Sequence, residues 1–213
     1  MATQKIKILL AFLLLSLSHY GFSEDIQFTV LLNEKPIGEH LFSITNNTIK
    51  SQAKFDVKLW IIPAYKYRHE AEETYKENCL IYLKSDTQDG ADTYSIKTVN
   101  TNDDLNLVIN GQNRPLPSCV QSFRYWDHNF IDQKNAINPQ DGEIYELTFS
   151  QGESDQVRVN DQKILCTKYT LKAYKENDEK FHIEVWYEKN SQRWVKLRSF
   201  VENDNVLDYT LNE

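Results

Sequence analysis

The sequence predicts an all-β protein, built as a single large, strongly curved antiparallel sheet or a barrel-like domain. Two observations predict it: apolar and polar residues alternate along most of the chain, and short turn sequences separate the alternating runs. A third is that no helix-period stretch of about twelve or more residues follows the N-terminal segment, which excludes parallel βαβ folds and their nucleotide-binding loops. A two-sheet sandwich is the structural alternative.

The first 23 residues have the pattern of a secretory signal peptide. Lys5 and Lys7 form a positive end, an apolar run follows, and small residues precede a cleavage point. The apolar run, residues 6–18, is shorter than the roughly 20 residues that a membrane span requires, so an uncleaved anchor is the weaker interpretation. We expect residues 24–213 to form the mature chain, a single antiparallel β domain that is periplasmic or secreted and has no transmembrane anchor.

Composition and charge narrow the class of protein further. The chain is 40% hydrophobic and 12% aromatic, which is enough apolar surface to order a globular core and excludes disordered and collagen-like classes. The net charge of -7 becomes two units more negative when Lys5 and Lys7 leave with the signal peptide. A surface of this sign does not favour nucleic acid or anionic lipid, which bind clustered Lys and Arg.

Alternation indicates where the strands lie. From Ile49 to Lys58 the odd positions are apolar or small and the even positions are polar, as a strand with one wet face requires. Trp186 and Tyr187 are neighbours in such a run, so one ring is expected in the core and the other outside. The expected strands, in chain order, cover residues 26–32, 40–44, 49–58, 65–76, 79–84, 92–99, 105–109, 144–149, 156–159, 163–173, 181–187, 193–201 and 205–211.

Turn sequences fall between these strands. They are Pro36 to Gly38, Asp89-Gly90, Asn110-Gly111, Asp141-Gly142, Asn160-Asp161, Asn177-Asp178, Asn190-Ser191 and Asn203-Asp204. Short strands joined by such turns predict antiparallel hairpins, and a twisted sheet of about ten or more strands must curl, close or split. The exception is the aromatic-rich stretch at residues 115–142, which we expect to be one long connection with about one helical turn.

Three cysteines follow the signal peptide. In an oxidising compartment two of them form a bridge and the third stays a thiol. Cys79 and Cys119 are the favoured pair, because Cys166 lies in the middle of an expected strand among apolar neighbours. The other pairings stay open, since spacing does not determine connectivity. No Cys-x-x-Cys pair is present, which disfavours a zinc site and a thioredoxin-type redox role.

The strand at residues 65–76 carries the first candidate site. One face presents Tyr65, Tyr67 and His69, while the opposite face is charged. An inward row of two phenols and an imidazole could line a cavity that binds a small amphipathic molecule. Rows of this kind more often form a half-buried sheet face, whose polar groups bond the backbone.

The second candidate site lies in the aromatic-rich connection. Tyr125 and Trp126 are followed by Asp127 and His128, which places an aromatic platform beside an acid and a base. We take Tyr125 and Trp126 as candidate ligand contacts. A tryptophan in such a connection more often plugs the end of a barrel.

Signatures of enzymes, metal sites and cofactors are weak. The stretch from His69 to Glu73 lacks the second histidine of a zinc-protease helix, and His182 with Glu184 has no cysteine pair to complete a deaminase-type site. No Gly-x-Ser-x-Gly elbow occurs. We therefore expect a protein that is not an enzyme and holds neither a metal nor a cofactor.

A series of short landmarks runs through the chain in a fixed order. They are Pro36-Ile37-Gly38, Tyr65 with Tyr67, Cys79-Leu80, Ser85-x-Thr87-x-Asp89-Gly90, Tyr125-Trp126, Asn138-Pro139-Gln140-x-Gly142 and Trp186-Tyr187. In these landmarks the sequence resembles an uncharacterised family, a domain of unknown function found in signal-peptide-bearing exported proteins of Gram-negative bacteria. The resemblance covers nearly the whole mature chain and implies a single antiparallel β domain in the periplasm. It implies no activity, and Tyr75 stands where the family's acidic-aromatic strand has Trp.

These observations favour a periplasmic binding or carrier module for a small amphipathic or lipid-like molecule. The ligand would lie on the concave face of the sheet, against Tyr65, Tyr67, His69 and Trp126. The alternative is a structural or envelope-assembly accessory protein that acts through its surface and binds no small molecule. Exposed aromatics or an unpaired edge strand would favour that alternative. The identity of the ligand, the oligomeric state and any protein partner stay open.

Overall fold

The computed structural model of the protein describes residues 23–59, 62–101, 104–201 and 203–212. The predicted signal peptide lies outside the described residues, except for Ser23. The strands, in chain order, are β1 (Ser23–Leu32), β2 (Lys35–Thr45), β3 (Thr48–Leu59), β4 (Ile62–Lys76), β5 (Cys79–Asp89), β6 (Asp92–Thr101), β7 (Asp104–Ile109), β8 (Gln112–Pro115), β9 (Asn135–Ile137), β10 (Ile144–Phe149), β11 (Glu153–Val159), β12 (Gln162–Lys175), β13 (Asp178–Glu188), β14 (Trp194–Val201) and β15 (Asn205–Asn212). A short 3-10 helix, η1 (His128–Asp132), lies in the long connection between β8 and β9. Among the described residues, no helix has the length and apolar character needed to cross a membrane.

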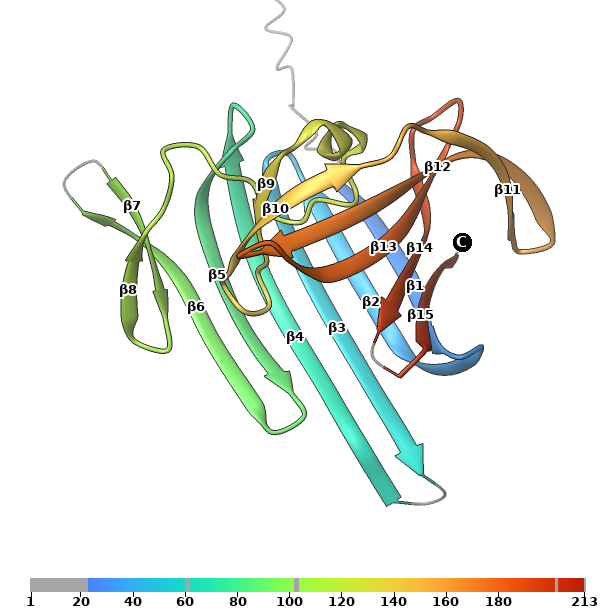
Figure 1. The fold of residues 1–213 in the computed structure, drawn as a ribbon, viewed down its shortest axis with the longest axis horizontal. Helices are drawn as coiled ribbons and strands as arrows, with labels where there is room; N and C mark the ends of the chain where they lie inside the picture. The colour runs from blue at the N-terminus through green and yellow to red at the C-terminus, as the bar shows by residue number, and fades with distance from the viewer. Residues whose placement is uncertain (1–22, 60–61, 102–103, 202, 213) are drawn as a thin grey trace, which may run out of the picture.

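The strands form one antiparallel sheet (Figure 1). Their hydrogen-bonded order is β8-β7-β6-β5-β4-β3-β2-β1-β15-β14-β13-β12-β10-β9, and β11 pairs with β12 beside this path. The first and last strands of the chain pair with each other, since β1 lies next to β15. The predicted fold class is therefore confirmed: the protein is all-β, and its large antiparallel sheet is strongly curved but not closed. The two-sheet alternative does not describe it.

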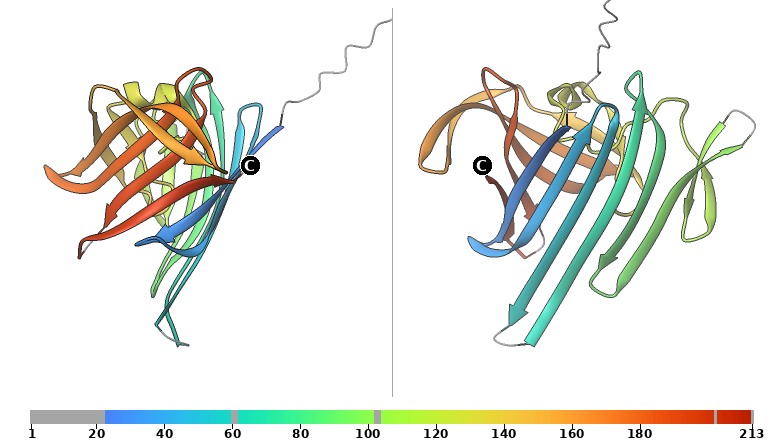
Figure 2. Two further views of the ribbon diagram at one scale, coloured as in Figure 1. Left: turned by 90° about the vertical axis from the view of Figure 1, so that its right-hand side faces the viewer. Right: turned by 180° about the vertical axis from the view of Figure 1, so that it is seen from behind.

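The sheet curls until its last strands cover part of its first. Figure 1 shows β9, β10 and β12 lying in front of the long N-terminal strands, and the side view of Figure 2 shows the curl at one end of the molecule. Where the two parts of the curled sheet are not joined by backbone hydrogen bonds between strands, side-chain contacts hold them together. Ser85 on β5 donates a hydrogen bond to the carbonyl oxygen of Pro139 (2.6 Å), and Arg114 on β8 pairs with Glu143 (2.9 Å). β3 and β4 extend past the other strands at the opposite end.

The hairpin turns differ from the sequence prediction at three places. The expected turn at Pro36 to Gly38 is wrong, because the chain turns at Asn33 and Glu34, both with positive φ, and β2 begins at Lys35. Gly38 is needed for another reason: a Cβ there would lie 1.9 Å from the carbonyl oxygen of Lys54 on β3. The turns expected at residues 89–90 and 177–178 are each shifted by one residue, to Gly90-Ala91 and to Glu176-Asn177.

The apolar positions of the alternating pattern pack into two clusters. The larger fills the curve of the sheet, where the Phe28 ring lies 4.2 Å from that of Trp194, and Phe42 packs on Trp194 at 5.4 Å. The smaller lies against β5, β6 and β7 and includes Ile137 of β9. β9 was missed by the sequence prediction because it is only three residues long, but Ala136 and Ile137 are fully buried and join the long connection to the core.

The expectation that Trp186 and Tyr187 lie on opposite sides, one in the core and one outside, is wrong. Both are buried, at 4% and 1% exposure. The register of β13 with β14 shifts between these two residues, and β11 adds a second cover: the Trp186 indole N–H donates to Asp155 on β11 (2.7 Å). The alternating pattern predicts that a strand buries one face. Here β11 also covers the other face of β13 near Trp186.

Candidate ligand-binding site

A pocket of about 400 Å³ lies at the curled end of the sheet. Its walls come from four places in the chain: the β2–β3 turn at Asn46-Asn47, the β4–β5 turn at Glu77-Asn78, the connection at residues 124–129, and Gln192 before β14. Glu24 of β1 also lines it. Hereafter we call this the end pocket. Its volume is within the range of small-molecule sites, about 300 to 1,000 Å³.

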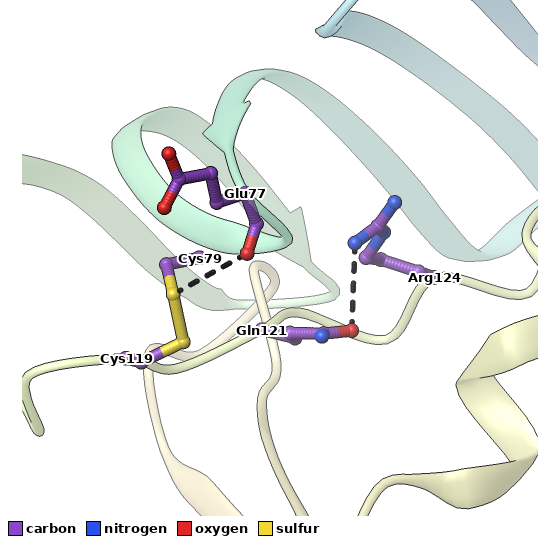
Figure 3. Close-up of a disulfide and its surroundings, with 5 residues drawn as sticks. All are labelled: Glu77, Cys79, Cys119, Gln121 and Arg124. Atoms are coloured by element: carbon purple, nitrogen blue, oxygen red, sulfur yellow. Dashed lines mark hydrogen bonds between the residues drawn. A yellow bond between two sulfur atoms is a disulfide. The ribbon is translucent and has the colours of Figure 1, made fainter.

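A disulfide holds the two main walls of the end pocket together (Figure 3). Cys79, at the start of β5, is bonded to Cys119 in the long connection, with an S–S distance of 2.00 Å. This is the pair that the sequence favoured, and Cys166 is a buried free thiol. Next to the bridge, the Leu80 N–H donates to the carbonyl oxygen of Val120 (2.8 Å). The disulfide and this hydrogen bond therefore fix the long connection to the start of β5. Five residues after Cys119 the connection reaches the pocket, at Arg124.

Arg124 forms the inner wall of the end pocket. Its side chain is 10% exposed, and its guanidinium lies 4.2 Å from the centre of the Tyr75 ring and pairs with Asp127 at 2.8 Å. A third contact, with the Gln121 side-chain oxygen, is longer at 3.4 Å and is drawn in Figure 3. The Arg124 Nε has no hydrogen-bond partner among the described residues. The guanidinium is therefore fixed by stacking and by one carboxylate.

A buried carboxyl group lies near Arg124. Glu73 is 2% exposed and accepts a short hydrogen bond from the Tyr75 hydroxyl, which is also within 2.6 Å of the Ser122 hydroxyl. Burial raises the pKa of Glu73, while the hydrogen bonds from Ser122 and Tyr75 and the charge of Arg124 act in the opposite direction. This cluster joins β4 to the long connection next to the inner wall of the pocket.

Trp126 is the one sequence-predicted ligand contact that lines the end pocket. It packs against Phe42 at 5.5 Å and touches both apolar clusters, so it also covers the end of the core. Tyr125, its neighbour, does not line the pocket: its ring packs inward against Phe130 (5.6 Å) and Trp194 (5.7 Å). Both residues were predicted as ligand contacts, but only the Trp126 side chain lies in the pocket wall, and the Tyr125 ring lies in the core.

The row of Tyr65, Tyr67 and His69 does not reach the end pocket. Tyr65 is 39% exposed at the other end of β4 and donates a hydrogen bond to Asp89. Tyr67 is buried and stacked on Phe55 at 4.9 Å, and its hydroxyl has no partner among the described residues. His69 is 2% exposed and bonds the Thr87 hydroxyl at 2.9 Å. Two of the three side chains therefore belong to the packed interior.

A second buried histidine, His40, lies beside this row and was missed by the sequence analysis. Its ring stacks on Phe42 at 4.1 Å and lies 6.4 Å from that of His69, and within the described part of the chain neither of its nitrogens has a hydrogen-bond partner. Burial lowers the pKa of His40, with a further contribution from His69, and burial lowers the pKa of His69 to about 4. Both rings are therefore neutral at pH 7.

His128 completes the far wall of the end pocket. It is the first residue of η1, and its ring packs against Tyr187 at 4.9 Å and Tyr169 at 5.8 Å. Asp127 caps η1 by accepting the Asn129 backbone N–H at 3.0 Å. In the described ranges no three His, Cys, Asp or Glu side chains converge as a metal ion would require.

Fold and pocket together define a class of protein: an open, curled antiparallel sheet with a small polar pocket at its curled end. The model of a domain of unknown function, DUF6134, matches residues 28–212, and the chain belongs to this family. Most of the described sheet lies within the match.

Comparison with known proteins adds structural likeness without a function. The fold is similar to the crystal structure of a β-barrel-like protein of a domain of unknown function, DUF1849, from Brucella abortus, with a TM-score of 0.63 and 9% identity over 89% of this chain and 95% of that one. A DUF1329 family protein from Desulfovibrio piger also matches, with a TM-score of 0.23 and 10% identity over 90% and 82% of the two chains. No curated protein matches this sequence.

Proposed function

We propose that this protein is an exported binding module, in the periplasm or outside the cell, that holds one small amphipathic molecule in the end pocket. The observation that carries the proposal is the mixed lining of that pocket. Trp126, Ile44 and Ile49 give it an apolar side, and the hairpin tips and Arg124 give it a polar one. Small-ligand sites combine an apolar wall with a few polar groups that fix orientation in this way.

We propose the end pocket as the ligand site in place of the row on β4. The side chains of Tyr67 and His69 are packed in the interior, whereas the end pocket is open to solvent and includes Trp126. Glu24, the expected first residue of the mature chain, lines this pocket. Cleavage of the signal peptide there would leave the new N-terminus beside the ligand.

Native mass spectrometry of the protein purified from the periplasm of its own cells tests the proposal. We expect a mature chain that starts at Glu24 and carries an additional small-molecule mass. Trp126→Leu keeps apolar bulk and removes the indole, so it should lose that mass, whereas Tyr82→Ala, an exposed aromatic of β5, should keep it. A ligand-free mass for the wild-type protein, or equal occupancy in Trp126→Leu, contradicts the proposal.

A second candidate function is that of an accessory protein that acts through its surface. Two observations favour it. The sheet is not closed, and its end strand β8 is exposed at all four residues. The outer face of β2 to β5 holds a further hollow of about 370 Å³, lined largely by side chains of both charges such as Lys50, Glu72 and Lys84. Cross-linking in the envelope, followed by mass spectrometry, would detect a partner on these surfaces.

A further inference from the structure

We infer that the end pocket recognises an uncharged, hydroxyl-rich group, such as a saccharide, as the polar part of its ligand. The inference rests on the proposed binding function and names the chemistry of the ligand. Three features of the pocket carry it: the number of side-chain amides in its wall, the arrangement of its charges, and the position of Trp126.

Amide side chains dominate the polar wall of the pocket. Asn46 and Asn47 come from one hairpin, Asn78 from the next, and Gln192 from the approach to β14. Their side chains are exposed and have no hydrogen bond to another described residue. An amide offers two donors and a carbonyl oxygen with two lone pairs. Hydroxyl groups both donate and accept, so a group with several hydroxyls can pair with these amides without a buried charge.

The charges of the pocket oppose an ion of either sign. Glu24 and Glu77 are exposed at the rim, and within the described residues neither carboxylate has an ion-pair partner. In the expected mature chain the N-terminal ammonium group of Glu24 offsets one of them, so the rim keeps one net negative charge that opposes an anion. A cation that reached the inner wall would meet the guanidinium of Arg124, which pairs with Asp127 and lies near the buried carboxyl group of Glu73. Desolvation makes such like-charge contacts costly. A neutral ligand avoids both penalties.

Trp126 supplies the surface for the less polar side of such a ligand. It is half-buried, held against Phe42 on one side, and lines the pocket on the other. An aromatic ring buries much apolar area at little conformational cost, and its face can cover the C–H groups of a sugar ring while the amides bond the hydroxyls. The same chemistry is found in a free saccharide and in the headgroup of a glycolipid.

Nuclear magnetic resonance titration of the mature protein tests the inference with four probes. Maltose and n-dodecyl maltoside carry the neutral hydroxyl-rich group, while dodecanoate and dodecyltrimethylammonium carry the same tail with an anion or a cation. Each amphiphile is kept below its critical micelle concentration. The readouts are the Trp126 indole N–H and the side-chain amides of Asn47 and Gln192. We expect the maltoside to shift these signals with a Kd at least about tenfold tighter than either charged amphiphile.

The two saccharide probes separate the possible sources of the group. Equal binding of maltose and the maltoside indicates a free saccharide, and tighter binding of the maltoside indicates a glycolipid. Either result supports the inference. Equal or tighter pocket binding of dodecanoate or dodecyltrimethylammonium overturns it and leaves the proposed function standing. If none of the four probes shifts the pocket signals, the proposed function fails as well.

A matched pair of variants adds an independent check. Asn47→Asp with Gln192→Glu keeps the size of both side chains, removes two amide groups with their four N–H donors and adds two charges, and should weaken maltoside binding about tenfold or more. Asn113→Asp with Gln162→Glu adds the same charge at exposed positions outside the pocket and should leave the Kd within about twofold. Wild-type affinity in the pocket variant contradicts the inference.

Discussion

At the scale of single residues, the interior of the sheet is unusual for the polar groups that it buries. His40, His69 and Glu73 are each less than 10% exposed. His69 has one hydrogen bond, to Thr87, while the two nitrogens of His40 have none to the described residues. Burial of these rings is compatible with folding because both stay neutral, which avoids the cost of a buried charge.

We predict that His69 makes the protein sensitive to acid. Its folded-state pKa of about 4 is below the unfolded value of about 6.5, so the unfolded chain binds a proton first. The stabilising contribution is full above pH 6.5 and is lost as the pH falls toward 4, by about 2 kcal/mol between pH 7 and pH 5. Urea unfolding at both pH values measures it.

Two variants isolate this contribution. His69→Gln lowers stability at pH 7 but should reduce the pH 7 to pH 5 difference by about 2 kcal/mol. Gln162→Asn, at an exposed position without a titratable group, should leave that difference unchanged. An unaltered pH difference in His69→Gln would show that the ring is not kept neutral by burial.

Residue-level prediction from the sequence succeeded where one strand face determines the environment. Tyr67 and His69 were expected to point inward, and they do. The partners that decide their role come from other strands, so the sequence of β4 alone could not show that His40 and Phe55 fill the space next to them. The amides at Asn46, Asn47, Asn78 and Gln192 were not among the predicted site or turn residues, because a local pattern does not show which chain segments meet at a pocket.

At the scale of elements, the long connection between β8 and β9 is the part that builds the pocket. It is held to the sheet at two points: by the disulfide at Cys119, and by Phe123, whose N–H donates to the carbonyl oxygen of Ile137 (3.2 Å). Directly after Phe123 it brings Arg124 and Trp126 to the wall of the pocket. Its aromatic content was visible in the sequence, whereas its docking position was not.

We predict that the disulfide contributes about 4 kcal/mol to stability, because it closes a loop of 40 residues in the unfolded chain. Cys79→Ser with Cys119→Ser should lose this amount in urea unfolding. A reducing agent should shift the wild-type midpoint toward that of the double variant and leave the double variant unchanged. A wild-type midpoint that does not respond to reduction would contradict the prediction.

The β2–β3 ladder supplies a second test at this scale. Gly38→Ala would place a methyl group 1.9 Å from the Lys54 carbonyl oxygen, so the strands would have to separate locally. We expect a loss of more than about 2 kcal/mol by thermal or urea unfolding. Gly90→Asn is the matched control, since its φ of +61° suits Asn and the nearest side chain is at ordinary contact distance, so it should cost less than about 1 kcal/mol. Equal losses would show that the ladder tolerates the added Cβ.

At the scale of the whole molecule, the sheet grows to fifteen strands and curls without closing. Alternation and turns were sufficient to predict an antiparallel sheet that must bend, because these are local signals. These local signals could not predict which distant strands meet when the sheet curls. The pairing of β1 with β15 and the packing of β9 and β10 against β5 are long-range contacts that no local pattern encodes.

The curled end is therefore where the least predictable parts of the chain meet. Two hairpin tips, the long connection and the approach to β14 converge there, and together they line one pocket. Trp126 alone among the five predicted ligand contacts lies in it. The binding function proposed for the molecule depends on this convergence and on no single motif.

The most direct measurement is a crystal structure of the protein isolated, without refolding, from the envelope of its own cells. Our account predicts electron density for an organic molecule in the end pocket, in contact with Trp126 and within hydrogen-bond distance of Asn47 or Gln192. A pocket filled only by water in that preparation would contradict the account.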